Sequence, residues 1–230
     1  MNQTNAEIKK TSRWWAILSV ELIITLLVLL ASIWAFAFTV EMVFVSKASD
    51  LDDAVFEAVS KMVRPALTKF MLSITFLGNH AFLIPANFLL LGFYWGRKNR
   101  KFSRRILVIA LSSLSLKLLL KNSFQRLRPD IPLLEKVAGF SFPSGHALMS
   151  VTFYGLLIYI AWREVSNPVW KWAITIFLGL LILLVSFSRI YLRVHYASDV
   201  IAGVALGIFW LLVSLWLVGK LEKKATTKNA

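Results

Sequence analysis

The sequence predicts an all-α protein that crosses a membrane with six transmembrane helices and carries one short helix on the membrane surface. Its 230 residues are 58% hydrophobic and its mean hydropathy is +0.69, which is too apolar for a soluble globular chain of this size. The apolar residues also fall into six runs that approach the roughly 20 residues a helix needs to cross the hydrocarbon core. These observations exclude the soluble classes of protein.

The six predicted spans cover about residues 14–38, 70–95, 106–122, 145–162, 172–189 and 199–219. We interpret the first as an uncleaved anchor, because its apolar run exceeds the about 7 to 15 apolar residues of a secretory signal. Between the first two spans, residues 49–64 place Asp residues ahead of spaced apolar ones. This pattern is typical of a short helix on the outer interface, and nothing in it demands more than a structural connector.

The chain is predicted to be a single integral membrane domain over residues 1–230. It contains no internal repeat and no low-complexity segment that would mark a second unit. Residues 1–13 and 220–230 are predicted to be cytoplasmic basic tails, and the last ten residues are expected to be solvated and disordered.

The positions of Lys and Arg predict that both termini are cytoplasmic. Basic residues cluster before the first span, at 97–105, at 163–171 and after the last span, and most Trp residues lie at the same helix ends. Both features mark the inner side of a membrane. The formal net charge of +14 would suggest a nucleic-acid partner in a soluble protein, but short clusters between apolar runs favour a bilayer and no nucleic acid.

The available side chains narrow the chemistry further. The chain has no Cys, which excludes disulfides, thiolate nucleophiles and Cys-ligated metals. Any imidazole chemistry must come from His80, His146 or His195, the three His of the sequence.

The first unusual polar segment is Lys121-x6-Arg128-Pro129 at the outer end of the third span. Seven residues are nearly two helical turns, so both cations would share a face if the helix continues to Pro129 and stops there. Snorkelling of long basic side chains toward the headgroups is the alternative explanation.

The second segment, Pro143-Ser144-Gly145-His146, stands where the fourth span begins. Pro and Ser suit a helix start, Gly allows a ligand to approach the backbone, and a helix N-terminus binds anions. The alternative is an ordinary cap with an incidental His.

The third segment is Ser188-Arg189-x5-His195-x3-Asp199. His195 and Asp199 are four residues apart and would be neighbours on one helical face. The carboxylate can fix the tautomer of the imidazole and leave its other nitrogen free to attack, as in catalytic triads. A buried structural His–Asp pair is the alternative.

The alternation of spans places all three segments on the same outer face. Three cations there call for a multiply charged anion, and phosphate fits because the Arg fork binds its oxygens bidentately. No acidic cluster that could hold Mg²⁺ lies nearby in the sequence, so we expect no metal and no cofactor, with the cations stabilising the transferring phosphoryl group.

The three motifs, in this order, resemble the phosphatidic acid phosphatase type 2 superfamily, and the resemblance covers residues 121–199. It implies that His195 is the nucleophile of a phosphohistidine intermediate, that Asp199 orients it, and that His146 is the general acid and then the base. It also implies that phosphate is bound by the side chains and backbone of Lys121, Arg128, Arg189, Ser144 and Gly145.

Several polar residues fall outside the motifs. Glu21 and His80 lie inside predicted spans, where we expect structural partners on neighbouring helices. Lys117 is expected to snorkel outward. Arg126 and Arg193 flank the site and could contact a headgroup or a second phosphate.

The short, partly apolar connection at 130–142 leaves no room for a large lid. A lipid phosphate or diphosphate is therefore the expected substrate class, such as undecaprenyl diphosphate, phosphatidylglycerophosphate, phosphatidic acid or diacylglycerol pyrophosphate. The compact chain suggests a bacterial cytoplasmic membrane. A lipid phosphotransferase using the same site remains open, as does the oligomeric state; a transporter of an anionic substrate fits less well, because its cations would lie near the midplane.

Overall fold

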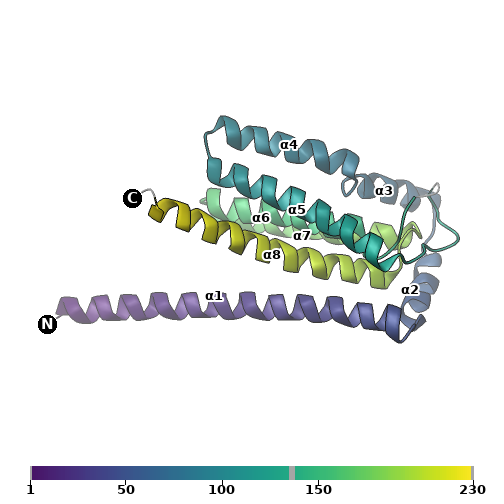
Figure 1. The fold of residues 1–230 in the computed structure, drawn as a ribbon, viewed down its shortest axis with the longest axis horizontal. Coiled ribbons are helices and arrows are strands. Elements are labelled where there is room, and N and C mark those ends of the chain that lie inside the picture. Colours follow the sequence, from purple (N-terminus) through teal and green to yellow (C-terminus); the bar gives the residue numbers. More distant parts are fainter. Residues whose placement is uncertain (1, 135–137, 229–230) are drawn as a thin grey trace.

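The computed structural model describes residues 2–134 and 138–228, and within those ranges the chain is helical with no strand (Figure 1). The helices are α1 (Asn2–Val40), α2 (Asp50–Ser60), α3 (Pro65–Phe76), α4 (His80–Gly96), α5 (Arg100–Phe124), α6 (Gly145–Glu164), α7 (Pro168–Tyr191) and α8 (Ala197–Lys228), with a π-helical turn at Glu41–Val45 after α1. The all-α prediction is confirmed.

The number of membrane spans also agrees with the sequence. Over its described residues the chain has five helices long and apolar enough to cross a membrane, namely the apolar part of α1 with its π-helical turn, α5, α6, α7 and α8. The sixth is a broken span, because α3 and α4 are inclined by 40° to one another at residues 77–79. The prediction of one continuous helix over 70–95 is therefore corrected.

The break in this span lies where α7 packs closely against the chain. A Cβ at Gly78 would lie 2.4 Å from Val185 Cγ1, so only Gly lets α7 approach the chain here. The carbonyl of Leu77 accepts a hydrogen bond from the Tyr154 hydroxyl at 2.8 Å. Asn79 then caps the next helix by accepting from the Ala81 N–H at 3.0 Å, which satisfies an amide with no partner inside the helix.

Helix α6 lies at the centre of the bundle and packs against α5, α7 and α8, while α1 runs along α8 at the outside. Figure 1 shows the two termini at one end of the molecule and α2 at the other. Much of α1 is covered by exposed apolar side chains, among them Leu22, Leu30 and Trp34. Such a surface suits a helix that faces lipid.

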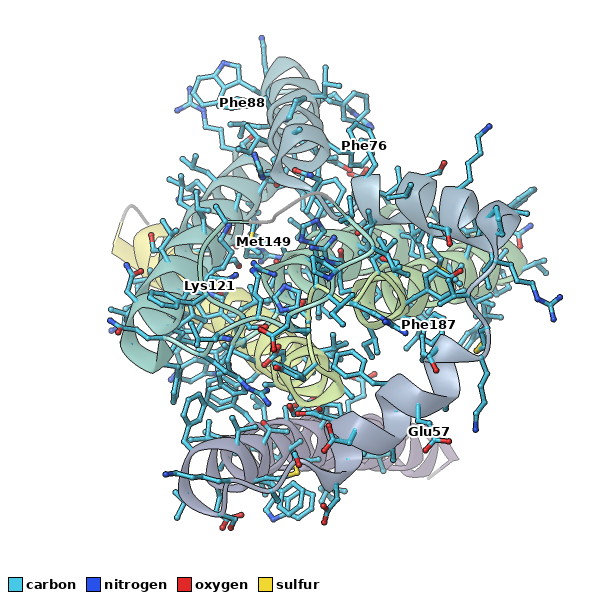
Figure 2. All side chains as sticks on the ribbon, turned by 90° about the vertical axis from the view of Figure 1, so that its right-hand side faces the viewer. Glu57, Phe76, Phe88, Lys121, Met149 and Phe187 are labelled. Carbon is cyan, nitrogen blue, oxygen red and sulfur yellow. The ribbon has the colours of Figure 1, made fainter. Side chains whose placement is uncertain are left out.

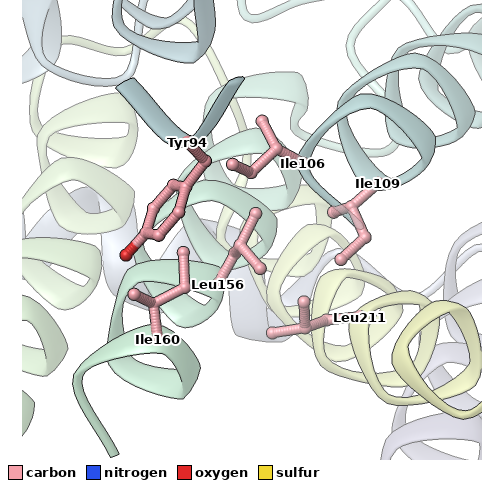
Figure 3. Packing of buried hydrophobic residues seen from close by; sticks show 6 residues of the cluster. All are labelled: Tyr94, Ile106, Ile109, Leu156, Ile160 and Leu211. Atoms are coloured by element: carbon pink, nitrogen blue, oxygen red, sulfur yellow. The ribbon is translucent and has the colours of Figure 1, made fainter. Parts of the chain in front are cut away.

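The end near the termini is held by an apolar cluster joined to buried ion pairs. Tyr94, Ile106, Ile109, Leu156, Ile160 and Leu211 pack together there (Figure 3). Next to them Tyr94 donates to Glu164 at 2.6 Å. Arg105 Nη2 lies 2.7 Å from the buried Glu222 Oε2, and Arg105 Nη1 donates to the Tyr159 hydroxyl.

The prediction of a disordered C-terminal tail is corrected for the described residues, because α8 continues to Lys228 instead of ending near residue 219. Glu222 in this extension pairs with Arg105, and residues 229–230 lie outside the described residues. Helix α1 likewise begins at Asn2, within the segment predicted as an N-terminal tail.

Helix α2 occupies the middle of the segment predicted for the interfacial helix. It packs on α7 and α8, with Val59 in a buried cluster that includes Met71 and Tyr191. The Tyr191 hydroxyl also lies 2.9 Å from the Thr68 hydroxyl of α3. These contacts attach α2 and α3 to the end of the bundle where the three polar segments meet.

Candidate functional site

The three polar segments converge at the end of the bundle seen in Figure 2, where Lys121 and Met149 are labelled. Lys121 lies in the last turn of α5, Arg189 in the last turn of α7 and Asp199 in the first turn of α8. Every residue predicted for the site lies at this end. The eight residues come from six different loops or helix ends, so the tertiary fold has to bring them together.

His195 is held by partners on both ring nitrogens. Its Nδ1 lies 3.2 Å from Ser141 Oγ and 3.4 Å from Asp199 Oδ2, while its Nε2 lies 3.2 Å from Arg128 Nη1. Arginine has only donors, so Nε2 must be the nitrogen without a proton and Nδ1–H must point to Ser141 and Asp199. The contacts thus assign the tautomer in which Nε2 carries no proton and its electron pair accepts a hydrogen bond from Arg128.

His195 is also held neutral. Its side chain is 1% exposed, and burial lowers the pKa of His195 from 6.5 to about 3, although the neighbouring Asp199 carboxylate acts in the opposite direction. The cations Arg189 and Arg128 lower it further. A neutral imidazole is the form that can act as a nucleophile near pH 7.

Asp199 is fully buried and makes more contacts than an orienting carboxylate needs. Its Oδ2 accepts from the Tyr196 N–H at 2.9 Å and from the Ser141 hydroxyl. Its Oδ1 accepts from Arg126 Nη1 at 2.6 Å. These donors fix the plane of the carboxylate, so that one oxygen always faces His195.

The helical spacing predicted for His195 and Asp199 is corrected. Helix α8 begins at Ala197, so His195 precedes it and the two residues are not neighbours on a helical face. Asp199 instead reaches back to the N–H of Tyr196 just before the helix, as the third residue of a capping box does. The pair meets through this capping contact.

The shared helical face predicted for Lys121 and Arg128 is also wrong. Helix α5 ends at Phe124, and Gln125 takes a left-handed conformation with φ 47°. Pro129 disfavours the helical conformation for the residue before it, and Arg128 lies in the loop that follows α5. There Arg128 donates to the carbonyls of Gly139 at 2.9 Å and Val194 at 2.6 Å.

On the side of the site around His146, several polar atoms lack hydrogen-bond partners. Three buried polar atoms, Ser144 Oγ, His146 Nε2 and Arg189 Nε, have no hydrogen-bond partner among the described residues. Arg189 does donate from Nη1 to Thr75 at 2.6 Å. Ser144 stands just before α6 without capping it, so the first N–H groups of that helix also lack an intrahelical acceptor. Unpaired buried donors are costly unless a ligand satisfies them.

A cavity of about 620 Å³ connects these groups to the apolar part of the bundle. His146, Arg189, His195, Lys121 and Arg128 line its polar end. Apolar residues of α4 and α5 line the rest, including Leu83, Ile84, Phe88, Leu91, Leu107, Leu111, Leu114 and Leu118. Several of these are exposed on the bundle surface, such as Phe88 and Leu111, so the cavity opens sideways between α4 and α5.

Arg126, expected from the sequence to flank the site and contact a headgroup or a second phosphate, is instead paired with two carboxylates. Arg126 bridges Asp199 and the buried Asp52 of α2, with Nη2 lying 2.8 Å from Asp52 Oδ2. Burial disfavours the Arg126 cation, but Asp199 and Asp52 outweigh it and raise the pKa of Arg126. Asp52 also accepts from the N–H of Ser198 at 2.8 Å and from its hydroxyl at 2.7 Å.

Helix α2 is therefore more than the connector expected from the sequence. Its buried Asp52 joins it to Arg126 and to the start of α8. The run of three Asp at residues 50–53 was a signal, because a helix start needs only one capping carboxylate. Nothing local distinguishes Asp52 from the exposed Asp53.

The remaining polar candidates have different positions. His80 is exposed at the start of α4 and lines the cavity, and among the described residues it has no interhelical hydrogen bond of the kind expected for it. Glu21 is exposed on α1, and its side chain has no partner among the described residues. Arg193 takes a left-handed conformation with φ 54° between α7 and α8. Lys117 lines the cavity instead of pointing outward.

Metal ligands are not grouped in the part of the chain that the structure describes. There, no set of three or more His, Asp or Glu is arranged to hold a metal ion. The charges that face the cavity are cationic.

Comparison with known proteins identifies a family and several similar proteins. The family model of the PAP2 superfamily matches residues 102–223. A phosphatidylglycerophosphatase B of Bacillus subtilis (strain 168) is 33% identical over 159 residues, which cover 68% of this chain and 78% of that protein. An undecaprenyl-diphosphatase of Sulfolobus acidocaldarius is 36% identical over 102 residues, covering 44% of this chain and 45% of that protein.

Solved structures are similar over more of the chain. The crystal structure of a transmembrane PAP2-type phosphatidylglycerolphosphate phosphatase from Bacillus subtilis matches with a TM-score of 0.74 and 28% identity, covering 85% of this chain and 96% of that one. The structure of Aquifex aeolicus LpxE matches with a TM-score of 0.55 and 28% identity, covering 70% and 93%.

Proposed function

The chain belongs to the PAP2 superfamily and is a membrane lipid phosphatase, and on that premise we propose that it removes the terminal phosphate of a lipid phosphomonoester or diphosphate through a phosphohistidine at His195. One observation carries this proposal. His195 Nε2, which carries no proton and accepts from Arg128, lies at the polar end of a cavity where His146 Nε2 and Arg189 Nε have no partner among the described residues.

The first step is attack of His195 Nε2 on phosphorus. An N–P bond forms as the bond from phosphorus to the leaving oxygen breaks, and protonated His146 gives its proton to that oxygen. Asp199 stabilises the cationic imidazole as its Nδ1–H becomes more acidic. Lys121, Arg128 and Arg189 balance the charge on the phosphoryl oxygens.

In the second step His146 acts as a base and His195 is the leaving group. Neutral His146 takes a proton from water, and the resulting hydroxide attacks the phosphohistidine. The N–P bond breaks, its electron pair returns to His195, and inorganic phosphate leaves. His146 is then protonated again, so the cycle closes without a metal ion, the fixed cations acting in its place.

Ser144 and the first N–H groups of α6 complete the phosphate site in this proposal. They supply hydrogen bonds at a helix N-terminus, where the dipole favours an anion. Gly145 leaves room here for the Lys117 side chain, whose Cδ would lie 2.9 Å from a Cβ at this position.

The cavity supports a lipid as the substrate. A headgroup at the polar end would leave its tail along the apolar residues of α4 and α5, where the cavity opens between the helices. The named activities of the relatives, phosphatidylglycerophosphatase and undecaprenyl-diphosphatase, are both reactions on membrane lipids. We place both candidate lipids in the substrate class.

The site is proposed to face the exterior of a bacterial cytoplasmic membrane. The end that carries both termini also carries the basic run at 97–101, which favours the cytoplasmic side. A reporter fused after Arg128 is expected to be active only outside the cytoplasm. Activity only in the cytoplasm would overturn this orientation.

A phosphate-release assay in detergent tests the chemistry. With EDTA present, the purified protein should release inorganic phosphate from lipid phosphates, and rapid quenching with labelled substrate should trap an acid-labile phosphoenzyme. His195→Ala should trap none. Loss of activity to EDTA with recovery on Mg²⁺, or a phosphoenzyme in His195→Ala, would refute the mechanism, and label passed to an acceptor lipid would indicate a phosphotransferase.

A further inference from the structure

Lys117 extends the row of cations into the cavity. Its side chain is half-buried and lines the cavity one helical turn before Lys121. A Cβ at Gly145 would lie 2.9 Å from Lys117 Cδ and 3.6 Å from Lys121 Cε, so both lysine chains cross the start of α6 at the same point. Lys117 lies outside the three sequence motifs.

The surroundings of Lys117 contain cations and no described carboxylate. The described residues that line the cavity include Lys121, Arg128 and Arg189 but neither Asp nor Glu. Lys121 donates to the carbonyl of Phe140 at 2.7 Å, whereas Lys117 makes no hydrogen bond or ion pair with any described residue. An ionisable side chain inside a membrane span is costly and is typically kept for a ligand.

The depth of Lys117 indicates which part of a ligand it would meet. Along α5 the lining residues run from Lys121 through Lys117 to Leu114, Leu111 and Leu107. Four residues of helix span about 6 Å. Lys117 therefore lies between the phosphate-binding cations and the apolar part of the cavity, at the junction of a headgroup and its tail.

We propose that Lys117 binds a second anionic phosphate, the one between the scissile phosphoryl group and the lipid tail. This inference rests on the proposed function and narrows its substrate class. The second anion is the inner phosphate of a lipid diphosphate or the phosphodiester of phosphatidylglycerophosphate. A lipid whose only phosphate is the scissile one, such as phosphatidic acid, has no group for Lys117.

Matched substrate pairs test the proposal. Farnesyl diphosphate and farnesyl monophosphate share a tail, as do phosphatidylglycerophosphate and phosphatidic acid, and only the first of each pair has the second phosphate. Lys117→Gln removes the charge but keeps the Cγ and Cδ atoms that pack on Gly145. Lys117→Arg keeps the charge. Lys69→Gln removes an exposed lysine of α3 outside the cavity and controls for general attraction of anionic lipids.

We expect Lys117→Gln to lower kcat/KM about tenfold on a substrate with the second phosphate, or about 1.4 kcal/mol, while changing its monophosphate partner less than about twofold. Lys117→Arg should retain most of the activity, and Lys69→Gln should not discriminate within a pair. A loss of kcat/KM on farnesyl diphosphate alone would identify the inner phosphate as the ligand of Lys117. A loss on phosphatidylglycerophosphate alone would identify the phosphodiester.

Equal loss on both members of each pair, or no loss on either, would overturn the second anion site while leaving the phosphatase proposal intact. Failure of the unmodified protein to release phosphate from any of the four lipids would instead overturn the proposed function.

Discussion

The two halves of the site differ in how their polar atoms are satisfied. Around His195, every nitrogen and oxygen that positions the ring has a partner, from Ser141 through Asp199 to Arg126. Around His146, three buried polar atoms have none among the described residues. The first half is preorganised in the free protein, whereas under the proposed mechanism the second is completed only when a phosphate binds.

This difference predicts two kinds of failure. Changes in the bonded half should disturb the nucleophile whatever the substrate, because its geometry exists in the free protein. Changes in the open half should depend on what is bound there, because those groups act only on the substrate or its leaving group.

The largest effect is expected from Asp199→Asn. An amide in place of the carboxylate presents a donor toward His195 and favours the wrong tautomer, and the corresponding change in a triad costs about 10⁴ in rate. Phosphate release under saturating lipid would measure it. The exposed Asp53→Asn is the control, and comparable loss in both variants would argue against an orienting role for Asp199.

His146→Ala should fail in a way that depends on the leaving group. Loss of a general acid costs about 10² to 10⁴ on a lipid alkoxide, but phosphoenzyme formation should persist with p-nitrophenyl phosphate, whose leaving group departs unprotonated. Rapid-quench trapping would measure both. Absence of phosphoenzyme with the activated substrate would transfer the nucleophilic role to His146.

Asp52→Asn should weaken the bonded half without touching the substrate. A hydrogen bond to a charged group contributes about 1.5–3 kcal/mol, so we expect kcat to fall about tenfold with KM little changed. The pH profile of kcat should also shift. Arg126 would lose its ion pair with Asp52 and would pair with Asp199 alone, which changes the charge environment of the His195–Asp199 pair. Asp53→Asn on the same helix turn is the matched control.

If Asp52 were only a structural anchor for α2, the outcome would differ. Asp52→Asn would then lower thermal stability but leave the pH profile of the folded enzyme unchanged. Partial recovery of kcat in Asp52→Glu would support the positioning role.

The last effect concerns the pH dependence of stability and not the catalytic rate. His195 has a pKa of about 3 in the folded protein and an ordinary value near 6.5 when unfolded, so below pH 6.5 the unfolded state takes up the proton first and stability falls as the pH falls. Between pH 7 and pH 5 this group should cost about 2 kcal/mol. His195→Gln should show a shallower loss of melting temperature over that range, and an equal loss would contradict the neutral, buried ring.

The positions of the membrane spans and of the three polar segments could be predicted from the sequence alone. A span is a local property, because each stretch of about 20 apolar residues satisfies its own backbone as a helix in lipid. The motif residues from Lys121 to Asp199 could be found in the same way, since each segment carries its own spacing. Which residue plays which catalytic role remains a prediction.

Only the tertiary structure decided which charges meet. The break at Gly78 depends on contact with Val185, and the end of α5 before Arg128 removes a helical face that spacing alone predicted. Asp52 reaches Arg126 across 74 residues and Ser198 across 146. A carboxylate that far away in the chain leaves no local pattern, because burial and pairing are properties of the packed bundle rather than of any one helix.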